Sequence, residues 1–67
     1  MKRAVSPLRR ERLLKGWDQY ELSHQSGFGL PYISMFETGR LVPREAEKER
    51  LAKALGVSPE KIFPEKE

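Results

Sequence analysis

Few side chains in this chain of 67 residues could support covalent or metal chemistry. The sequence contains no cysteine, so thiolate nucleophiles, thiolate metal ligands and disulfide bonds are excluded. Its single histidine, His24, has no cysteine or second histidine near it, and we expect a surface position on a helix. No nucleophile is paired with a base, and no glycine-rich loop could hold a phosphate. The sequence therefore predicts neither an enzyme nor a cofactor or metal site.

Positive charge is concentrated near the N-terminus, although the formal net charge is only +3. Residues 1–15 contain six basic side chains, and Glu11 is the only acidic one among them. Residues 44–67 contain six charges of each sign. The basic cluster favours a polyanionic partner, although a solvated helix face would give the same pattern. Arg9 and Arg10 could approach such a partner or only solvate their helix.

A second surface is predicted by the spacing of residues 30–38. Ile33 and Phe36 lie three residues apart and would share the buried face of a helix. The opposite face would then carry four side chains at positions i, i+3, i+4 and i+7, namely Pro31, Ser34, Met35 and Thr38. We expect these four side chains to be exposed.

Glycine and proline divide the chain into five short helices that would position this surface. The predicted helices run from about Leu8 to Lys15, Gln19 to Gln25, Leu30 to Thr38, Arg44 to Leu55 and Glu60 to Phe63. Ser6 and Asp18 are predicted N-caps, whereas Gly29 stands where a capping side chain is usual. No segment shows the strict alternation of a half-buried strand, so the predicted fold class is all-α.

The second and third helices meet the physical requirements of a helix-turn-helix. Both are short, and Gly27 between them can adopt the left-handed conformation of a sharp turn. The small side chain of Ser23 lets the two helices cross closely. In this arrangement the second helix of the pair protrudes from the surface.

The sequence is similar to the Cro and phage-repressor type of helix-turn-helix regulator from Leu8 to Phe63. The matching segments are Leu8–Gln19, Tyr32–Arg40, Leu51–Ser58 and Ile62–Phe63, in the right order and at the right spacing. The resemblance implies one compact five-helix domain over residues 1–67, with a basic arm at 1–6 and a tail at 64–67. It also implies sequence-specific binding of double-stranded DNA by a transcriptional regulator, a repressor, with the third helix in the major groove.

The resemblance assigns roles to individual residues. Gln19 would contact a phosphate and support the reading helix, while Thr38 and Arg40 would touch backbone phosphates. The side chains facing the major groove would be Leu30, Pro31, Ser34 and Met35. Tyr32 could donate its hydroxyl to a phosphate or pack at the edge of the helix. Arg12 and Glu37 would form a partly buried ion pair between the first and third helices.

The reading face departs from the usual pattern of this family, in which Arg, Lys, Gln or Asn contact bases. Here only Ser34 is polar, so the alternative is a helix-turn-helix scaffold that docks a partner protein through its apolar face. Glu11, Glu45 and Lys48 also occupy positions that are often apolar, which predicts a thinner core.

The remaining expectations concern assembly and location. A homodimer would place two third helices about one helical turn of DNA apart. Val57, Ile62 and Phe63 could form the apolar centre of that interface, or pack in the core, and Trp17 is expected in or against the core. No apolar run approaches the roughly 20 residues needed to span a bilayer. We expect a soluble, cytoplasmic protein with no membrane partner and no small-molecule substrate.

Overall fold

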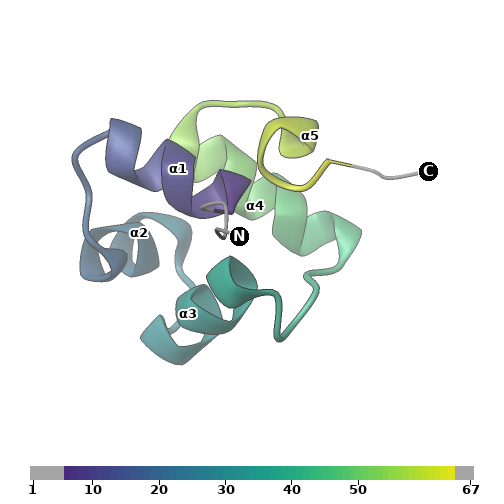
Figure 1. Ribbon diagram of the computed structural model, residues 1–67, viewed down its shortest axis with the longest axis horizontal. Coiled ribbons are helices and arrows are strands. Elements are labelled where there is room, and N and C mark those ends of the chain that lie inside the picture. Colours follow the sequence, from purple (N-terminus) through teal and green to yellow (C-terminus); the bar gives the residue numbers. More distant parts are fainter. Residues whose placement is uncertain (1–5, 65–67) are drawn as a thin grey trace, which may run out of the picture.

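The computed structural model describes residues 6–64 and folds them into five α-helices (Figure 1). The helices are α1 (Pro7–Leu14), α2 (Gln19–Ser26), α3 (Leu30–Thr38), α4 (Glu45–Leu55) and α5 (Pro59–Ile62). No strand occurs within residues 6–64, and the predicted all-α fold class is confirmed. Each helix boundary lies within one residue of the predicted one. The predicted basic arm, apart from Ser6, and the predicted tail, apart from Pro64, lie outside the described residues.

Local capping explains why the helices begin where they do. The Ser6 hydroxyl accepts a hydrogen bond from the Arg9 amide at 3.2 Å, and the Asp18 carboxylate accepts one from the Glu21 amide at 2.8 Å. Pro7 and Pro59 occupy the first position of their helices, where the missing N–H group costs nothing. These two prolines therefore belong to α1 and α5, which begin one residue before the predicted boundary.

The core lies where the five helices converge, and every helix contributes to it. Helix α4 packs against α2 and α5, α1 packs against α3 and α5, and α2 packs against α3. The buried apolar side chains are those of Leu8, Leu22, Ile33, Phe36, Leu51, Ala52, Leu55 and Ile62. Partly buried side chains that pack against them are Trp17, Phe28, Ala54, Val57 and Phe63. The three C-terminal residues considered for a dimer interface therefore contribute to the core.

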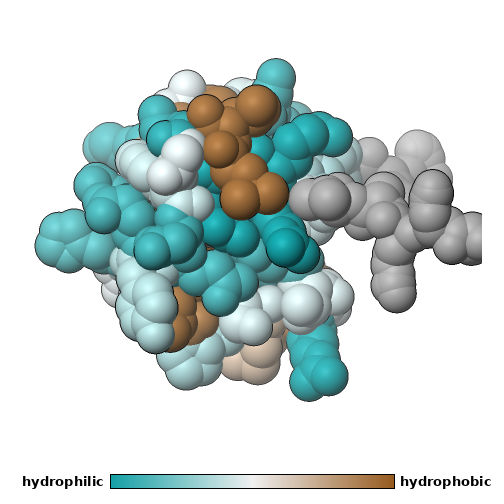
Figure 2. Space-filling model, turned by 60° about the vertical axis from the view of Figure 1, so that its left-hand side comes forward, coloured by the Kyte–Doolittle hydropathy of each residue, from teal (hydrophilic) through white to brown (hydrophobic). Residues whose placement is uncertain are grey.

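The three charged side chains at positions that are often apolar in the family differ in their burial. Glu11 is buried, Lys48 is half-buried and Glu45 is exposed. Seen from the side of α1 and α2, most of the surface is hydrophilic, with a hydrophobic patch near the top (Figure 2). No helix within residues 6–64 is long and apolar enough to cross a membrane.

Candidate nucleic-acid interface

The outer face of α3 points away from the core. Of the four side chains expected to be exposed, Pro31, Ser34 and Thr38 are exposed, whereas Met35 is half-buried beside them. The opposite side of the helix faces the core through Ile33 and Phe36. Helix α3 therefore presents one continuous strip of the side chains at i, i+3, i+4 and i+7 to the solvent.

Side chains at the two ends of α3 extend this strip. Leu30 is half-buried in the first turn, and Tyr32 is 50% exposed, with its ring 6.4 Å from that of Phe36. Arg40 lies exposed just beyond the C-cap Gly39. The Thr38 hydroxyl lies 3.0 Å from the Ser34 carbonyl oxygen and 3.3 Å from that of Met35, so its proton is used within the helix.

The turn between α2 and α3 is held by hydrogen bonds of the Ser23 and Ser26 side chains rather than by a side-chain cap on α3. Gly27 adopts the left-handed conformation that the sharp turn requires, with φ of 82°. The Ser23 hydroxyl donates to the Phe28 carbonyl at 2.5 Å, and the Phe28 amide donates to the Ser26 hydroxyl at 3.3 Å. Gly29 is the N-cap of α3 and offers no side-chain acceptor to the first amides of that helix.

Glu37 joins α3 to the two preceding helices. Its carboxylate accepts hydrogen bonds from Arg12 Nε at 2.6 Å, Arg12 Nη2 at 3.2 Å and Gln19 Nε2 at 3.0 Å. The remaining guanidinium nitrogen of Arg12 donates to the Trp17 carbonyl at 2.8 Å. The side chains of Arg12 and Glu37 are only 7% and 3% exposed. This Arg12–Glu37–Gln19 cluster is thus a buried ion pair with its hydrogen bonds satisfied.

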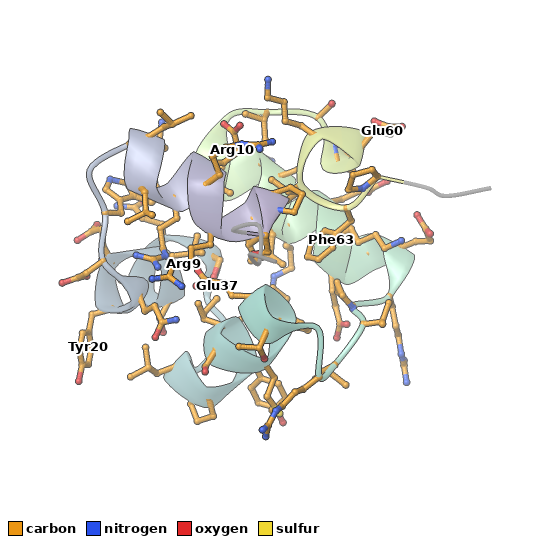
Figure 3. All side chains as sticks on the ribbon, in the orientation of Figure 1. Arg9, Arg10, Tyr20, Glu37, Glu60 and Phe63 are labelled. Atoms are coloured by element: carbon orange, nitrogen blue, oxygen red, sulfur yellow. The ribbon has the colours of Figure 1, made fainter. Side chains whose placement is uncertain are left out.

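Gln19 lies where it can support α3, because its amide nitrogen donates to Glu37. The same side chain is among those that line a surface hollow of about 620 Å³, as are Arg9 and Thr38. In Figure 3, Arg9 lies on the side of α1 that faces α2 and α3, whereas Arg10 lies on the opposite side. Two adjacent arginines therefore differ in their position relative to the exposed face of α3.

The contacts of Arg50 with the α2–α3 segment were not predicted from the sequence. This arginine of α4 donates from Nη2 to the Ser26 carbonyl at 3.1 Å, and its guanidinium carbon lies 4.2 Å from the centre of the Phe28 ring. Both partners belong to the α2–α3 segment, 22 and 24 residues earlier in the chain. In the sequence, Arg50 is one of several alternating charges of a solvated-looking helix, so no local signal distinguishes it.

Together the elements define a helix-turn-helix domain whose second helix is exposed along one face. A family model described as helix-turn-helix matches residues 8–62, and the chain belongs to this family. Domains of this family bind double-stranded DNA and are not enzymes. The term recognition helix is used below for α3.

Among solved structures, the chain is similar to a hypothetical transcription factor, NHTF, from Neisseria. The two share 36% sequence identity with a TM-score of 0.78 over 84% of this chain. The chain spans 64% of the length of that protein. The search of curated proteins found no match.

Proposed function

We propose that this protein is a sequence-specific, double-stranded-DNA-binding transcriptional regulator that inserts the recognition helix into the major groove. The observation that carries the proposal is the outer strip of α3, formed by the exposed Pro31, Ser34 and Thr38 and the half-buried Met35, on a helix whose opposite face packs in the core. A rigid helix standing proud of the surface fits the width of the major groove. The similarity to a protein described as a hypothetical transcription factor supports the same function.

The regulator acts as a repressor in this proposal. Occupying a site that overlaps a promoter is sufficient for repression, and it requires only a DNA-binding surface. We expect it to act in the cytoplasm.

Base reading in this protein rests on apolar contact. Leu30, Pro31 and Met35 have no side-chain donors or acceptors and cannot form bidentate hydrogen bonds with guanine or adenine. An apolar side chain can recognise the thymine methyl group in the major groove. Ser34 adds one adaptable hydrogen bond, and we expect groove shape to supply further selectivity.

Phosphate contacts position the recognition helix on the duplex in this proposal. Arg40 is exposed at the C-terminal end of α3, and Gln19 lies at the start of α2. Gln19 retains one amide hydrogen beyond its bond to Glu37. Thr38 would have to exchange its hydroxyl bond within the helix for a phosphate oxygen. Tyr32 is exposed enough for its hydroxyl to reach a phosphate.

The test begins with selection of duplexes from a random-sequence pool by the purified protein. Affinity for the selected duplex is then titrated at several salt concentrations, because phosphate contacts release counterions and make binding salt-dependent. Arg9→Ala should lower the slope of log K against log[salt] by about 0.9 when one phosphate contact is lost. Arg10→Ala is the matched control of equal charge on the opposite side of α1, and its slope should stay close to that of the unmodified protein.

Absence of binding to any selected duplex at low salt would contradict the proposed function. If a partner protein then bound in a manner abolished by Met35→Asp, the apolar strip of α3 would be a protein-docking surface instead. Equal slopes for the two arginine variants would remove Arg9 from the interface and leave the remaining proposal in place.

A further inference from the structure

We propose that Arg50 is a positioning residue for the recognition helix: by bridging α4 to the α2–α3 turn, it sets where the first turn of α3 meets DNA. The contact between Arg50, Ser26 and Phe28 is called the Arg50 clamp below. The inference rests on the proposed function, because its consequence is read as discrimination between DNA sequences.

The clamp combines a charge-assisted hydrogen bond with an aromatic contact. Arg50 Nη2 donates to the Ser26 carbonyl oxygen at 3.1 Å, near the C-terminal end of α2. A cation near the last carbonyls of a helix also interacts favourably with the helix dipole. The same guanidinium lies over the Phe28 ring at 4.2 Å, within the range of a cation–π interaction. The planar guanidinium can do both together, which a lysine ammonium cannot reproduce.

Phe28 passes this restraint to α3. Its ring meets the Phe36 ring edge to face, with centroids 5.4 Å apart and planes at 87°. Phe36 is 4% exposed and belongs to the buried face of the recognition helix. Phe28 is also two residues before Leu30, where α3 begins. A displacement of Phe28 would therefore move the end of α3 that carries Leu30 and Pro31.

The start of α3 has no side-chain cap, so the Arg50 clamp is an additional restraint on this segment. Gly29 provides no side-chain cap, and the first turn is held through its backbone carbonyl, which accepts from the Tyr32 and Ile33 amides at 3.0 and 3.2 Å. A Ser, Thr, Asp or Asn cap would have added only about a few tenths of a kcal/mol over glycine at this position. The Arg50 clamp restrains the same segment from α4, which the core holds through Leu51 and Leu55.

The experiment compares Arg50→Met with Lys53→Met. Lys53 is an exposed residue of the same helix, and its substitution removes the same charge. Each variant is titrated with the selected duplex and with a mixed-sequence duplex, at a temperature at which circular dichroism shows full folding. Arg50→Met should weaken binding to the selected duplex by about tenfold, from loss of the hydrogen bond and the aromatic contact. Binding to the mixed-sequence duplex should change no more than it does in Lys53→Met. For Arg50→Lys, the affinity for the selected duplex should lie between those of Arg50→Met and Lys53→Met.

Amide hydrogen exchange provides a readout independent of DNA. In Arg50→Met, the Tyr32 and Ile33 amides should exchange faster than in Lys53→Met, while the Lys48 amide of α4 should not. If Arg50→Met fails to fold, Phe28→Leu takes its place in the experiment. This variant removes the ring but keeps an apolar side chain, and it should give the same pattern of amide exchange.

An unchanged ratio between the two duplexes, in a wild-type protein that does discriminate, would overturn the positioning role and leave the proposed function intact. Uniformly faster exchange in all helices would also overturn it, because Arg50 would then contribute only global stability. A wild-type protein that binds both duplexes equally would instead contradict the proposed function itself.

Discussion

At the scale of single residues, Glu37 connects the exposed reading surface with the interior. It is buried on α3 between two exposed positions of the same helix, Ser34 and Thr38. A carboxylate taken out of water is costly unless its charge and its hydrogen bonds are satisfied. Arg12 supplies both through two of its nitrogens, and Gln19 adds a third donor. The cluster thereby holds α3 in one orientation against α1 and α2.

Removing one member of this buried pair should be costly. Arg12→Ala should lower the free energy of unfolding by about 3 kcal/mol or more, because it leaves the Glu37 charge buried without a counterion. Urea unfolding of the variant, with a double-mutant cycle to Glu37→Ala, measures both the loss and the coupling. The Lys48–Glu45 pair, at 3.4 Å and with an exposed Glu45, serves as control and should be worth about 0–1 kcal/mol. Additive losses for Arg12 and Glu37 would contradict the interpretation of the pair as a unit.

Met35 allows a residue-scale test of apolar base reading. Met35→Ala should weaken binding to the selected duplex by about 1 kcal/mol, the scale of a small apolar contact, and relax the preference at one base. Replacement of the facing thymine by uracil, which lacks only the methyl group, should reproduce most of this loss in the unmodified protein. Equal binding of uracil and thymine at every position would show that the apolar strip does not read DNA.

At the scale of elements, the turn between α2 and α3 depends on both its backbone conformation and its contact with α4. Gly27 and Gly39 end successive helices with the same φ of 82°. They differ in their surroundings. A Cβ atom on Gly27 would lie 2.8 Å from Arg50 Nη2, whereas one on Gly39 would meet nothing within 4 Å.

This difference allows the Arg50 clamp to be measured through a matched pair of substitutions. Gly39→Ala should cost about 1–2 kcal/mol of stability, which is the strain of a left-handed alanine. Gly27→Ala should carry the same strain and an additional loss, because Arg50 must move away from the turn. In an Arg50→Met background the extra loss should disappear, as measured by urea unfolding of the four variants. An equal cost of the two substitutions in the native background would show that the clamp adds no stability.

At the scale of the whole molecule, size restricts how two copies can share a DNA site. The principal extents are 32 × 24 × 20 Å. Half-sites one turn apart are separated by about 34 Å, slightly more than the longest extent, so two copies can lie side by side on one face of the duplex. We propose that the protein occupies such a site as a homodimer, the assembly expected from the family resemblance.

The spacing of half-sites should therefore control affinity. Two copies should bind cooperatively when the half-sites are about 10 base pairs apart. An insertion of about 5 base pairs turns one copy to the opposite face of the duplex and should abolish the cooperativity. Titration of both duplexes in an analytical ultracentrifuge gives the number of chains bound and the cooperativity. Independent binding at both spacings would contradict a dimeric mode.

The helices and the turn of this protein could be predicted from the sequence because their signals are local. Pro7, Asp18 and Gly27 act on backbone within a few residues, through φ restriction, capping and left-handed geometry. The burial of Ile33 and Phe36, and hence the exposed strip of α3, also follows from helical periodicity. These features needed no knowledge of how the helices pack.

The contacts between helices were decided by the tertiary structure. The sequence favoured the core for at least two of Val57, Ile62 and Phe63 but left an interface open, and only packing assigned all three to the core. The Arg50 clamp joins residues 22 and 24 positions apart, and a charged helix face does not indicate which side chain will meet an aromatic ring. The resemblance implied that Gln19 supports α3, but the structure was needed to show that its partner is Glu37. Such contacts depend on helix crossing geometry, which arises from the simultaneous packing of all five helices.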